Sequence, residues 1–273
     1  MYCHLEQVSV HYEVRGEGRP ILLIHGFGPD HRLMMGCFEP LFASRPGWRR
    51  IYLDLPGMGK TKGEAWINSS DDMLDVVLRF IDAVIPEERF LVAGESYGGY
   101  LARGIVYRRP EQVNGLALIC PAIEPESSKR DVPAHQVFDQ DEALLAELTP
   151  AEREEFASVA VVQDRYNWER FNEEIYAGLQ LADEAFLQKI KRRYAFSVDV
   201  DALSEPFAKP ALFLMGRQDR FVGYRDAWRI LENYPRASFA VLDRAGHNLQ
   251  VEQQRLFDEL VGEWLERVQK ETR

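Results

Sequence analysis

The hydrophobic positions of residues 1–120 fall into two alternating patterns. Short, continuous apolar runs are typical of strands buried on both faces. Apolar residues spaced three and four apart indicate helices with one buried face. The predicted strands are residues 8–14, which alternate as an edge strand does, and the apolar runs 20–24, 50–53, 90–93 and 113–120. The predicted helices cover residues 69–85, capped by Ser69 or Ser70, and residues 97–109, ended by Pro110.

The alternation returns over residues 211–269. There the predicted strands are residues 211–215 and 238–242, and the predicted helices are residues 225–233 and 251–269. Strands that alternate with helices in this way form a mainly parallel sheet covered by helices on both faces. The sequence therefore predicts an α/β fold.

Residues 122–206 interrupt the alternation, because they contain no convincing buried strand and are typical of consecutive helices. One of these helices begins at Thr149, where proline and then glutamate follow in the order of a capping box. Further helices are expected over residues 168–181 and 183–196. We predict a core made of residues 1–121 and 207–273, with residues 122–206 inserted as a helical segment over one edge of the sheet.

The composition is that of an ordinary globular protein, with 46% hydrophobic and 28% charged residues in a chain of 273. The formal net charge is −11 and there is no basic cluster, which argues against a nucleic acid or an anionic membrane as partner. The three cysteines have no paired spacing, and no segment has the pattern of a signal peptide or a membrane span. We therefore expect a cytoplasmic protein that acts on a small-molecule substrate, as a monomer or a homodimer.

A candidate nucleophile lies between a predicted strand and a predicted helix. Residues 94–98 read Gly-Glu-Ser-Tyr-Gly, which is the Gly-x-Ser-x-Gly pattern in the setting that the chemistry requires. A serine hydroxyl must be exposed to a base before it can attack a carbonyl carbon, and a sharp strand-to-helix turn exposes it. Gly94 and Gly98 are small enough to permit such a turn. We predict that Ser96 is the nucleophile.

The general base is expected to be a histidine on a loop at the same edge of the sheet. The six histidines are His4, His11, His25, His31, His135 and His247. Only His247 directly follows a late predicted strand, whereas His4, His11 and His135 are predicted to be solvent-exposed. The acid that orients this histidine is predicted to be Asp219, which follows the preceding strand in the same way. The competing acids are Glu124, Glu126 and Asp243.

Two backbone N–H groups are candidates for binding the negative oxygen of a tetrahedral intermediate. The N–H of Tyr97 begins the helix after Ser96, and helix N-termini leave such groups unpaired. The N–H of Phe27 lies in a glycine-flanked turn after a buried strand. His25, in the same turn, is expected to brace it through hydrogen bonds. The side chains of Phe27 and Tyr97 are also expected to border the substrate pocket.

With these motifs the chain resembles the α/β-hydrolase superfamily over nearly its whole length. The matching segments are residues 25–28, 54–59, 94–98, 216–219 and 246–247, and they follow the family's order of nucleophile, acid and histidine. The resemblance implies a mostly parallel eight-stranded sheet with helices on both faces and a helical cap inserted after the sixth strand. It also implies that the turn at residues 54–59 has a structural role.

The residues and the resemblance together predict a serine hydrolase that cleaves a carboxylic ester or lactone through an acyl-enzyme. No cofactor is expected, and His25 and His31 do not have the spacing of a metal pair. Two alternatives stay open: hydrolysis of a carbon–carbon bond in a ring-cleavage product, and a signalling receptor that keeps these residues. Asn248 argues against the first alternative, because such enzymes often carry tryptophan after the catalytic histidine. A medium-sized, mostly apolar substrate is predicted from the aromatic residues of the insertion, which are Tyr166, Trp168, Phe171, Tyr176, Phe186, Tyr194 and Phe196.

Overall fold

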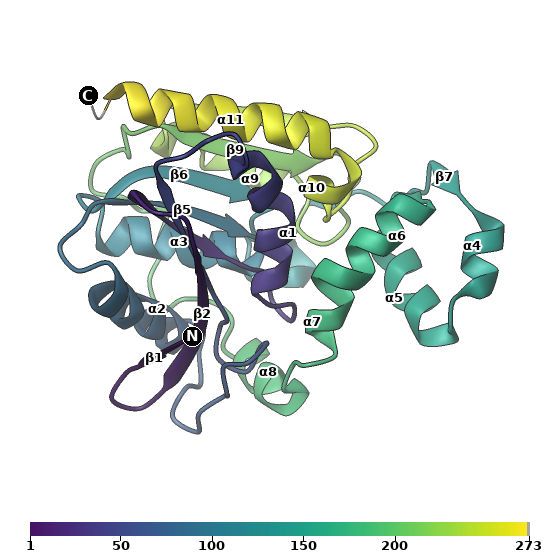
Figure 1. Cartoon of the computed structure of the whole chain (residues 1–273), viewed down its shortest axis with the longest axis horizontal. Helices are drawn as coiled ribbons and strands as arrows, with labels where there is room; N and C mark the ends of the chain where they lie inside the picture. Colours follow the sequence, from purple (N-terminus) through teal and green to yellow (C-terminus); the bar gives the residue numbers. More distant parts are fainter. Residues whose placement is uncertain (272–273) are drawn as a thin grey trace.

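The computed structural model describes residues 1–271, and within them one eight-stranded sheet runs in the order β1-β2-β4-β3-β5-β6-β9-β10 (Figure 1). The strands are β1 (Tyr2–His4), β2 (Ser9–Arg15), β3 (Arg19–Ile24), β4 (Trp48–Leu53), β5 (Phe90–Glu95), β6 (Val113–Ile119), β9 (Ala211–Gly216) and β10 (Ala237–Leu242). The pairs β1–β2 and β2–β4 are antiparallel, and the other neighbours are parallel. The predicted mostly parallel, eight-stranded sheet is confirmed.

Helices cover both faces of this sheet. On one face, α1 (His31–Phe42) and α11 (Gln254–Glu271) pack against each other and against the central strands. On the opposite face, α2 (Ser70–Val84) packs against α3 (Tyr97–Arg108), which contacts β3, β5 and β6 (Figure 1). Two short helices, α9 (Arg225–Arg229) and α10 (Leu249–Glu252), follow the late strands. No helix among residues 1–271 is both long and apolar enough to cross a lipid bilayer.

The apolar pattern explains why these segments fold as they do. All six residues of β5 and of β9 are buried, as continuous apolar runs require when helices lie on both faces. Helix α2 begins where the Ser69 hydroxyl accepts a hydrogen bond from the N–H of Asp72, at 3.2 Å. Its buried side chains recur at helical spacing, so that α2 presents one apolar face to the core.

The segment between β6 and β9 is mostly helical. Its helices are α4 (Glu142–Glu147), α5 (Pro150–Val159), α6 (Arg165–Phe171), α7 (Ala177–Leu179) and α8 (Glu184–Lys191), with a π-helical turn at Asn172–Tyr176. Figure 1 shows α4 to α7 in teal and green to the right of the sheet. The segment also contains two short strands, β7 (Asp139–Gln140) and β8 (Val162–Gln163), which pair in parallel. These strands interrupt the expected run of consecutive helices, and they were not predicted because two-residue strands leave no periodic signal.

Two further predictions about the elements need correction, and one helix was not predicted. The predicted edge strand is the second strand of the sheet, because β1 pairs along its outer side. Helix α1 was not predicted, although apolar residues recur along it at helical spacing. The closing helix does not run unbroken, since α10 ends at Glu252 and α11 begins at Gln254.

Candidate active site

Ser96 lies on a sharp turn between β5 and α3, with φ of 51° and ψ of −111°. A positive φ is uncommon for a residue other than glycine and indicates local backbone strain. The neighbours have no room for a side chain: a Cβ at Gly94 would lie 2.3 Å from the backbone of Gly98, and a Cβ at Gly98 would lie 2.1 Å from the carbonyl oxygen of Ile24. The two glycines therefore allow the turn that exposes the Ser96 hydroxyl.

The structure brings three of the predicted site residues into one hydrogen-bonded chain. The Nε2 atom of His247 lies 3.0 Å from the Oγ of Ser96, and its Nδ1 atom lies 2.8 Å from the Oδ2 of Asp219. The Oδ1 of Asp219 accepts hydrogen bonds from the N–H groups of Phe221 and Val222, at 2.8 and 3.1 Å. Because both oxygens of this carboxylate are used, its orientation toward His247 is fixed.

Burial and nearby charges have opposite effects on the pKa values of Asp219 and His247. Burial disfavours the ionised form of Asp219, but the nearby His247 and the hydrogen bonds that the carboxylate accepts outweigh it and lower its pKa. Burial also disfavours the imidazolium of His247, but the carboxylates of Asp219 and Glu95 outweigh it and raise its pKa to about 9. The two carboxylates therefore favour the protonated form of His247, which is the form that the imidazole reaches after it has taken the proton of Ser96.

The two predicted N–H donors lie at the same end of the sheet. Among residues 1–271, neither the N–H of Phe27 nor that of Tyr97 has a hydrogen-bond partner within the protein. The ring of Phe27 lines the cavity above Ser96 and contacts the Tyr97 ring edge-on, with centroids 5.1 Å apart. The side chain of Tyr97 is fully buried and donates to the Oγ of Ser70 at 2.8 Å. The expectation that the Tyr97 side chain borders the pocket is therefore wrong.

The turn that carries Phe27 is braced by His25. Its Nδ1 lies 2.7 Å from the carbonyl oxygen of Gly26, and its Nε2 accepts from the N–H of Leu55 at 3.0 Å. These two contacts fix a neutral ring that donates through Nδ1 and accepts through Nε2. Burial lowers the pKa of His25, which also favours this neutral form. His25 therefore positions the turn, as predicted from the sequence.

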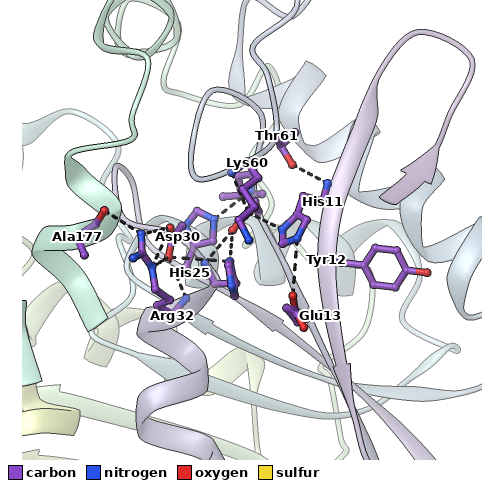
Figure 2. A network of polar contacts seen from close by, with 12 residues as sticks. His11, Tyr12, Glu13, His25, Asp30, Arg32, Lys60, Thr61 and Ala177 are labelled. Carbon is purple, nitrogen blue, oxygen red and sulfur yellow. Dashed lines mark hydrogen bonds and ion pairs between the residues drawn. The ribbon is translucent and has the colours of Figure 1, made fainter. Parts of the chain in front are cut away.

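A buried carboxylate, Asp54, holds the next part of the same loop. It accepts four hydrogen bonds, from the Nδ1 of His11 (2.8 Å), the Nδ1 of His31 (2.7 Å), the N–H of His31 (2.9 Å) and the N–H of Lys60 (2.9 Å). In Figure 2, His11 and Arg32 lie on opposite sides of this network, and Arg32 reaches the carbonyl of Ala177 in the insertion. His11 is buried, so the prediction that it is solvent-exposed is wrong.

The carboxylate of Asp54 and the two imidazoles also lie close enough together to be considered as a metal site. However, four N–H donors already saturate the two carboxylate oxygens, and both Nδ1 atoms carry the hydrogen that they donate. A metal ion would have to displace both of these hydrogen bonds. The geometry is that of a hydrogen-bonded hub that joins β2, α1 and the loop after β4.

Replacing Asp54 by Asn is expected to lower the free energy of unfolding by about 3 kcal/mol, because an amide oxygen cannot accept from all four donors and the amide NH2 would face another N–H. Burial raises the pKa of Asp54, but the hydrogen bond from His31 and the other N–H groups outweigh it and hold that pKa well below its ordinary value. The carboxylate therefore contributes its full stability above the unfolded pKa of about 4 and loses it as the pH falls further.

Urea unfolding followed by tryptophan fluorescence would measure this effect at neutral and at acidic pH. The difference in the free energy of unfolding between the wild type and Asp54→Asn is expected to become smaller below about pH 4. Asp75→Asn is the matched control, since Asp75 makes only an exposed ion pair with Arg79. Equal stability of the wild type and Asp54→Asn at neutral pH would show that the hub does not hold the loop.

A cavity of about 710 Å³ opens above Ser96 and His247. Its walls come from both parts of the chain: Leu33 and Phe221 from the core, and Phe171, Ile175, Leu179 and Tyr194 from residues 122–206. Polar groups also line it, among them Glu95 and Arg130. The size is that of a small-molecule site.

The competing candidates lie elsewhere. The carboxylate of Glu124 accepts a hydrogen bond from the N–H of Glu126, and the carboxylate of Glu126 accepts one from the hydroxyl of Ser128. The carboxylate of Asp243 accepts from the amide of Gln218. His135 is half-buried and contacts the carbonyl of Ala157 at 3.1 Å, so its predicted exposure is only partly correct.

Two acids near His247, the buried Glu95 and the half-buried Glu252, were not predicted from the sequence. Glu95, inside the serine motif, has its Oε1 3.4 Å from the Nε2 of His247. Glu252 accepts from the N–H groups of Gly246 and Val161, both at 2.6 Å, and so ties the His247 loop to the insertion. The sequence could have pointed to Glu95, because it is an acid directly beside the predicted nucleophile. Nothing in the sequence around Glu252 distinguishes it from other acids on a helix.

The profile of the family described as serine aminopeptidase, S33, matches residues 18–254 of the chain. The chain belongs to the α/β-hydrolase superfamily. The structure of this α/β-hydrolase is similar to that of an alpha/beta superfamily hydrolase from Oenococcus oeni, with a TM-score of 0.88. The two sequences are 28% identical, and the match covers 98% of this chain and 99% of the other.

Two kinds of named enzyme are among the relatives of this α/β-hydrolase. A 2-hydroxy-6-oxononadienedioate/2-hydroxy-6-oxononatrienedioate hydrolase of Paraburkholderia phymatum is 26% identical over 95% of this chain and 91% of its own. A pimeloyl-[acyl-carrier protein] methyl ester esterase of Legionella pneumophila is 25% identical over 88% of this chain and 92% of its own. The relatives therefore include both carbon–carbon hydrolases and esterases.

Proposed function

We propose that this α/β-hydrolase cleaves a carboxylic ester or lactone through an acyl-enzyme, with Ser96 as nucleophile, His247 as general base and Asp219 as the acid that orients it. The observation that carries the proposal is the hydrogen-bonded chain from Asp219 through His247 to Ser96 at the floor of a cavity. A relative named as a methyl ester esterase supports the same chemistry.

The proposed reaction has two halves. The Nε2 of His247 takes the proton of the Ser96 hydroxyl while Oγ bonds to the carbonyl carbon, and the N–H groups of Phe27 and Tyr97 stabilise the resulting oxyanion. The carbon–oxygen bond to the alcohol then breaks, and the alcohol leaves with the proton from His247. In the second half His247 takes a proton from water, the hydroxide attacks the acyl carbon, and the acid leaves as Ser96 regains its proton.

We propose further that residues 122–206 form a helical cap over this site and help to select the substrate. The apolar side chains that the insertion contributes to the cavity favour a medium-sized, mostly apolar group. We expect a small-molecule substrate, no nucleic-acid or membrane partner, no cofactor, and a monomer or homodimer. A cytoplasmic location is part of the proposal and fits three cysteines that are all unpaired.

A series of p-nitrophenyl esters of increasing acyl length, together with simple lactones, would test the proposed function. We expect turnover of esters with a rapid first release of p-nitrophenol, because an acyl-enzyme accumulates when deacylation is slow. A fluorophosphonate is expected to label Ser96, which mass spectrometry would locate. Stoichiometric ligand binding without turnover of any ester or lactone would instead favour the receptor alternative and contradict the proposal.

Carbon–carbon hydrolysis is the second candidate, because relatives named for that activity cover 95% and 96% of this chain. The same hydrogen-bonded residues would serve it, so the site geometry does not separate the two. The ratio of kcat/KM for a vinylogous diketone to that for an ester does separate them. A ratio well below one is expected for an esterase, and a ratio well above one would make the second candidate the function.

A further inference from the structure

Glu95 is a buried acid without a hydrogen-bond donor. Its side chain is 3% exposed and lines the cavity that contains Ser96. No N–H or O–H group of residues 1–271 donates a hydrogen bond to its carboxylate, and its one ion-pair contact is with the Nε2 of His247, at 3.4 Å. Buried carboxylates are normally paired and hydrogen-bonded. This exception lies directly beside the nucleophile.

The carboxylate of Glu95 faces two parts of the proposed machinery. One oxygen, Oε1, faces the imidazole of His247. The other, Oε2, lies against Gly26, where an added Cβ would come within 2.2 Å of it. Gly26 precedes Phe27, whose N–H is one of the two proposed oxyanion donors. Glu95 therefore lies between the proposed base and the turn that carries this donor.

In its charged form Glu95 opposes the proposed reaction in two ways. It stabilises a protonated His247, which can no longer accept the proton of Ser96. It also places a negative charge near the position where the oxyanion develops. A neutral Glu95 does neither. The state of this one proton therefore decides whether Ser96 can be activated.

We propose that Glu95 shares a proton with His247 and so sets the pH range in which Ser96 is reactive. The proton moves from the Nε2 of the imidazolium to the Oε1 of the carboxylate, which leaves a neutral imidazole and a neutral acid and changes no other bond. This inference rests on the proposed function. Glu95 acts through His247 and is a positioning residue in that sense.

The surrounding charges agree with such sharing. Burial raises the pKa of Glu95 to about 7, although His247 acts to lower it. The pKa of His247 is raised to about 9, because Asp219 and Glu95 together outweigh its burial. Two groups that interact so strongly lose their protons in steps that belong to the pair.

Other ionisable groups face this pair from the elements packed around it, and they modify the balance. The groups in electrostatic contact with Glu95 or His247 are Asp219 and Arg130 from loops at the carboxyl edge, Cys37 from α1, Cys120 after β6, and Tyr194 from the insertion. Among these, Arg130 acts to lower the pKa of His247. The thiols and the phenol stay neutral near pH 7, since burial raises the pKa of each. Asp219 and Glu95 are therefore the acids that raise the pKa of His247.

The decisive variant is Glu95→Gln, which keeps the size of the side chain and removes its charge. The acidic limb of kcat/KM for a p-nitrophenyl ester is expected to move to lower pH by about one unit, since His247 loses one of its two stabilising acids. Near pH 6 the variant is then expected to be about tenfold faster than the wild type. Glu205→Gln, at an exposed position, is the control for removing one carboxylate. An unmoved limb in Glu95→Gln would show that Glu95 only fills space.

Titration of the His247 ring by NMR tests the inference without any substrate. In the wild type the ring signals are expected to change in two steps, near the pKa values of the pair, and in Glu95→Gln in one step at lower pH. A single step in the wild type would overturn the proposal even if Glu95→Gln did not fold. If no ester is turned over but the two steps are present, the proposed function fails and the shared proton stands.

Discussion

Ser96→Ala is expected to lower kcat for p-nitrophenyl esters by at least about 10⁴-fold, because the reaction then has no nucleophile and keeps only binding and the oxyanion donors. The fold should tolerate the change. The hydroxyl does not cap helix α3, and its one side-chain hydrogen bond is with His247. Alanine has the same difficulty as serine in adopting a positive φ, so no strain is added. Thermal unfolding should therefore be nearly unchanged.

The matched control is Ser204→Ala, at an exposed position outside the proposed site. It is expected to keep both the activity and the fluorophosphonate label, while Ser96→Ala loses both. Residual activity of Ser96→Ala above a few per cent, with the label on another residue, would move the nucleophile elsewhere. If Ser96→Ala lost both its activity and its cooperative unfolding transition, the turn would need the hydroxyl for folding. The fluorophosphonate label on the wild type would then identify the nucleophile.

Most of the parallel strands could be predicted because they are buried on both faces. Strands β3 and β9 consist almost entirely of apolar residues, and no other common element gives short runs of that kind between helices. The mostly helical segment between β6 and β9 was predicted from the same contrast, because it lacks such runs. Its two short strands were not, because their pairing depends on segments more than 20 residues apart and not on local pattern.

The errors at the N-terminal edge have different causes. Strand β1 is three residues long, and only its pairing with β2 makes it a strand. Helix α1 was predictable from the spacing of its apolar residues after Asp30, which caps it, although Gly36 and Pro40 weaken the pattern. The burial of His11 requires its partner Asp54, which is 43 residues away and reaches it only through the fold.

The candidate site was predictable where chain order and strand ends carried the information. Ser96, Asp219 and His247 each follow a predicted strand, and parallel strands place their carboxyl ends at one edge of the sheet. The geometry of the contacts was not predictable. Glu95 is part of the Gly-x-Ser-x-Gly motif and so is visible in the sequence. Its distance to His247, however, depends on the turn at Ser96 and on the loop that carries the histidine.

Asp219→Asn is the second variant with a large expected effect, a loss in kcat of about 10⁴-fold. The amide oxygen can still accept from the N–H groups of Phe221 and Val222, so the loop should keep its shape. The amide NH2 then faces the Nδ1 of His247 and requires that atom to accept a hydrogen bond. The ring proton moves to Nε2, which points at Ser96 and can no longer take its proton.

Asp243→Asn is the matched control, because Asp243 is close to His247 in sequence, is exposed, and accepts from Gln218 instead. It should change kcat by less than about twofold, since it makes no contact with the base. The pH dependence adds a second criterion: without the charge of Asp219, the pKa of His247 falls, so the remaining activity should begin at lower pH than in the wild type. If Asp243→Asn were the inactive variant and Asp219→Asn the active one, the assignment of the orienting acid would have to be reversed.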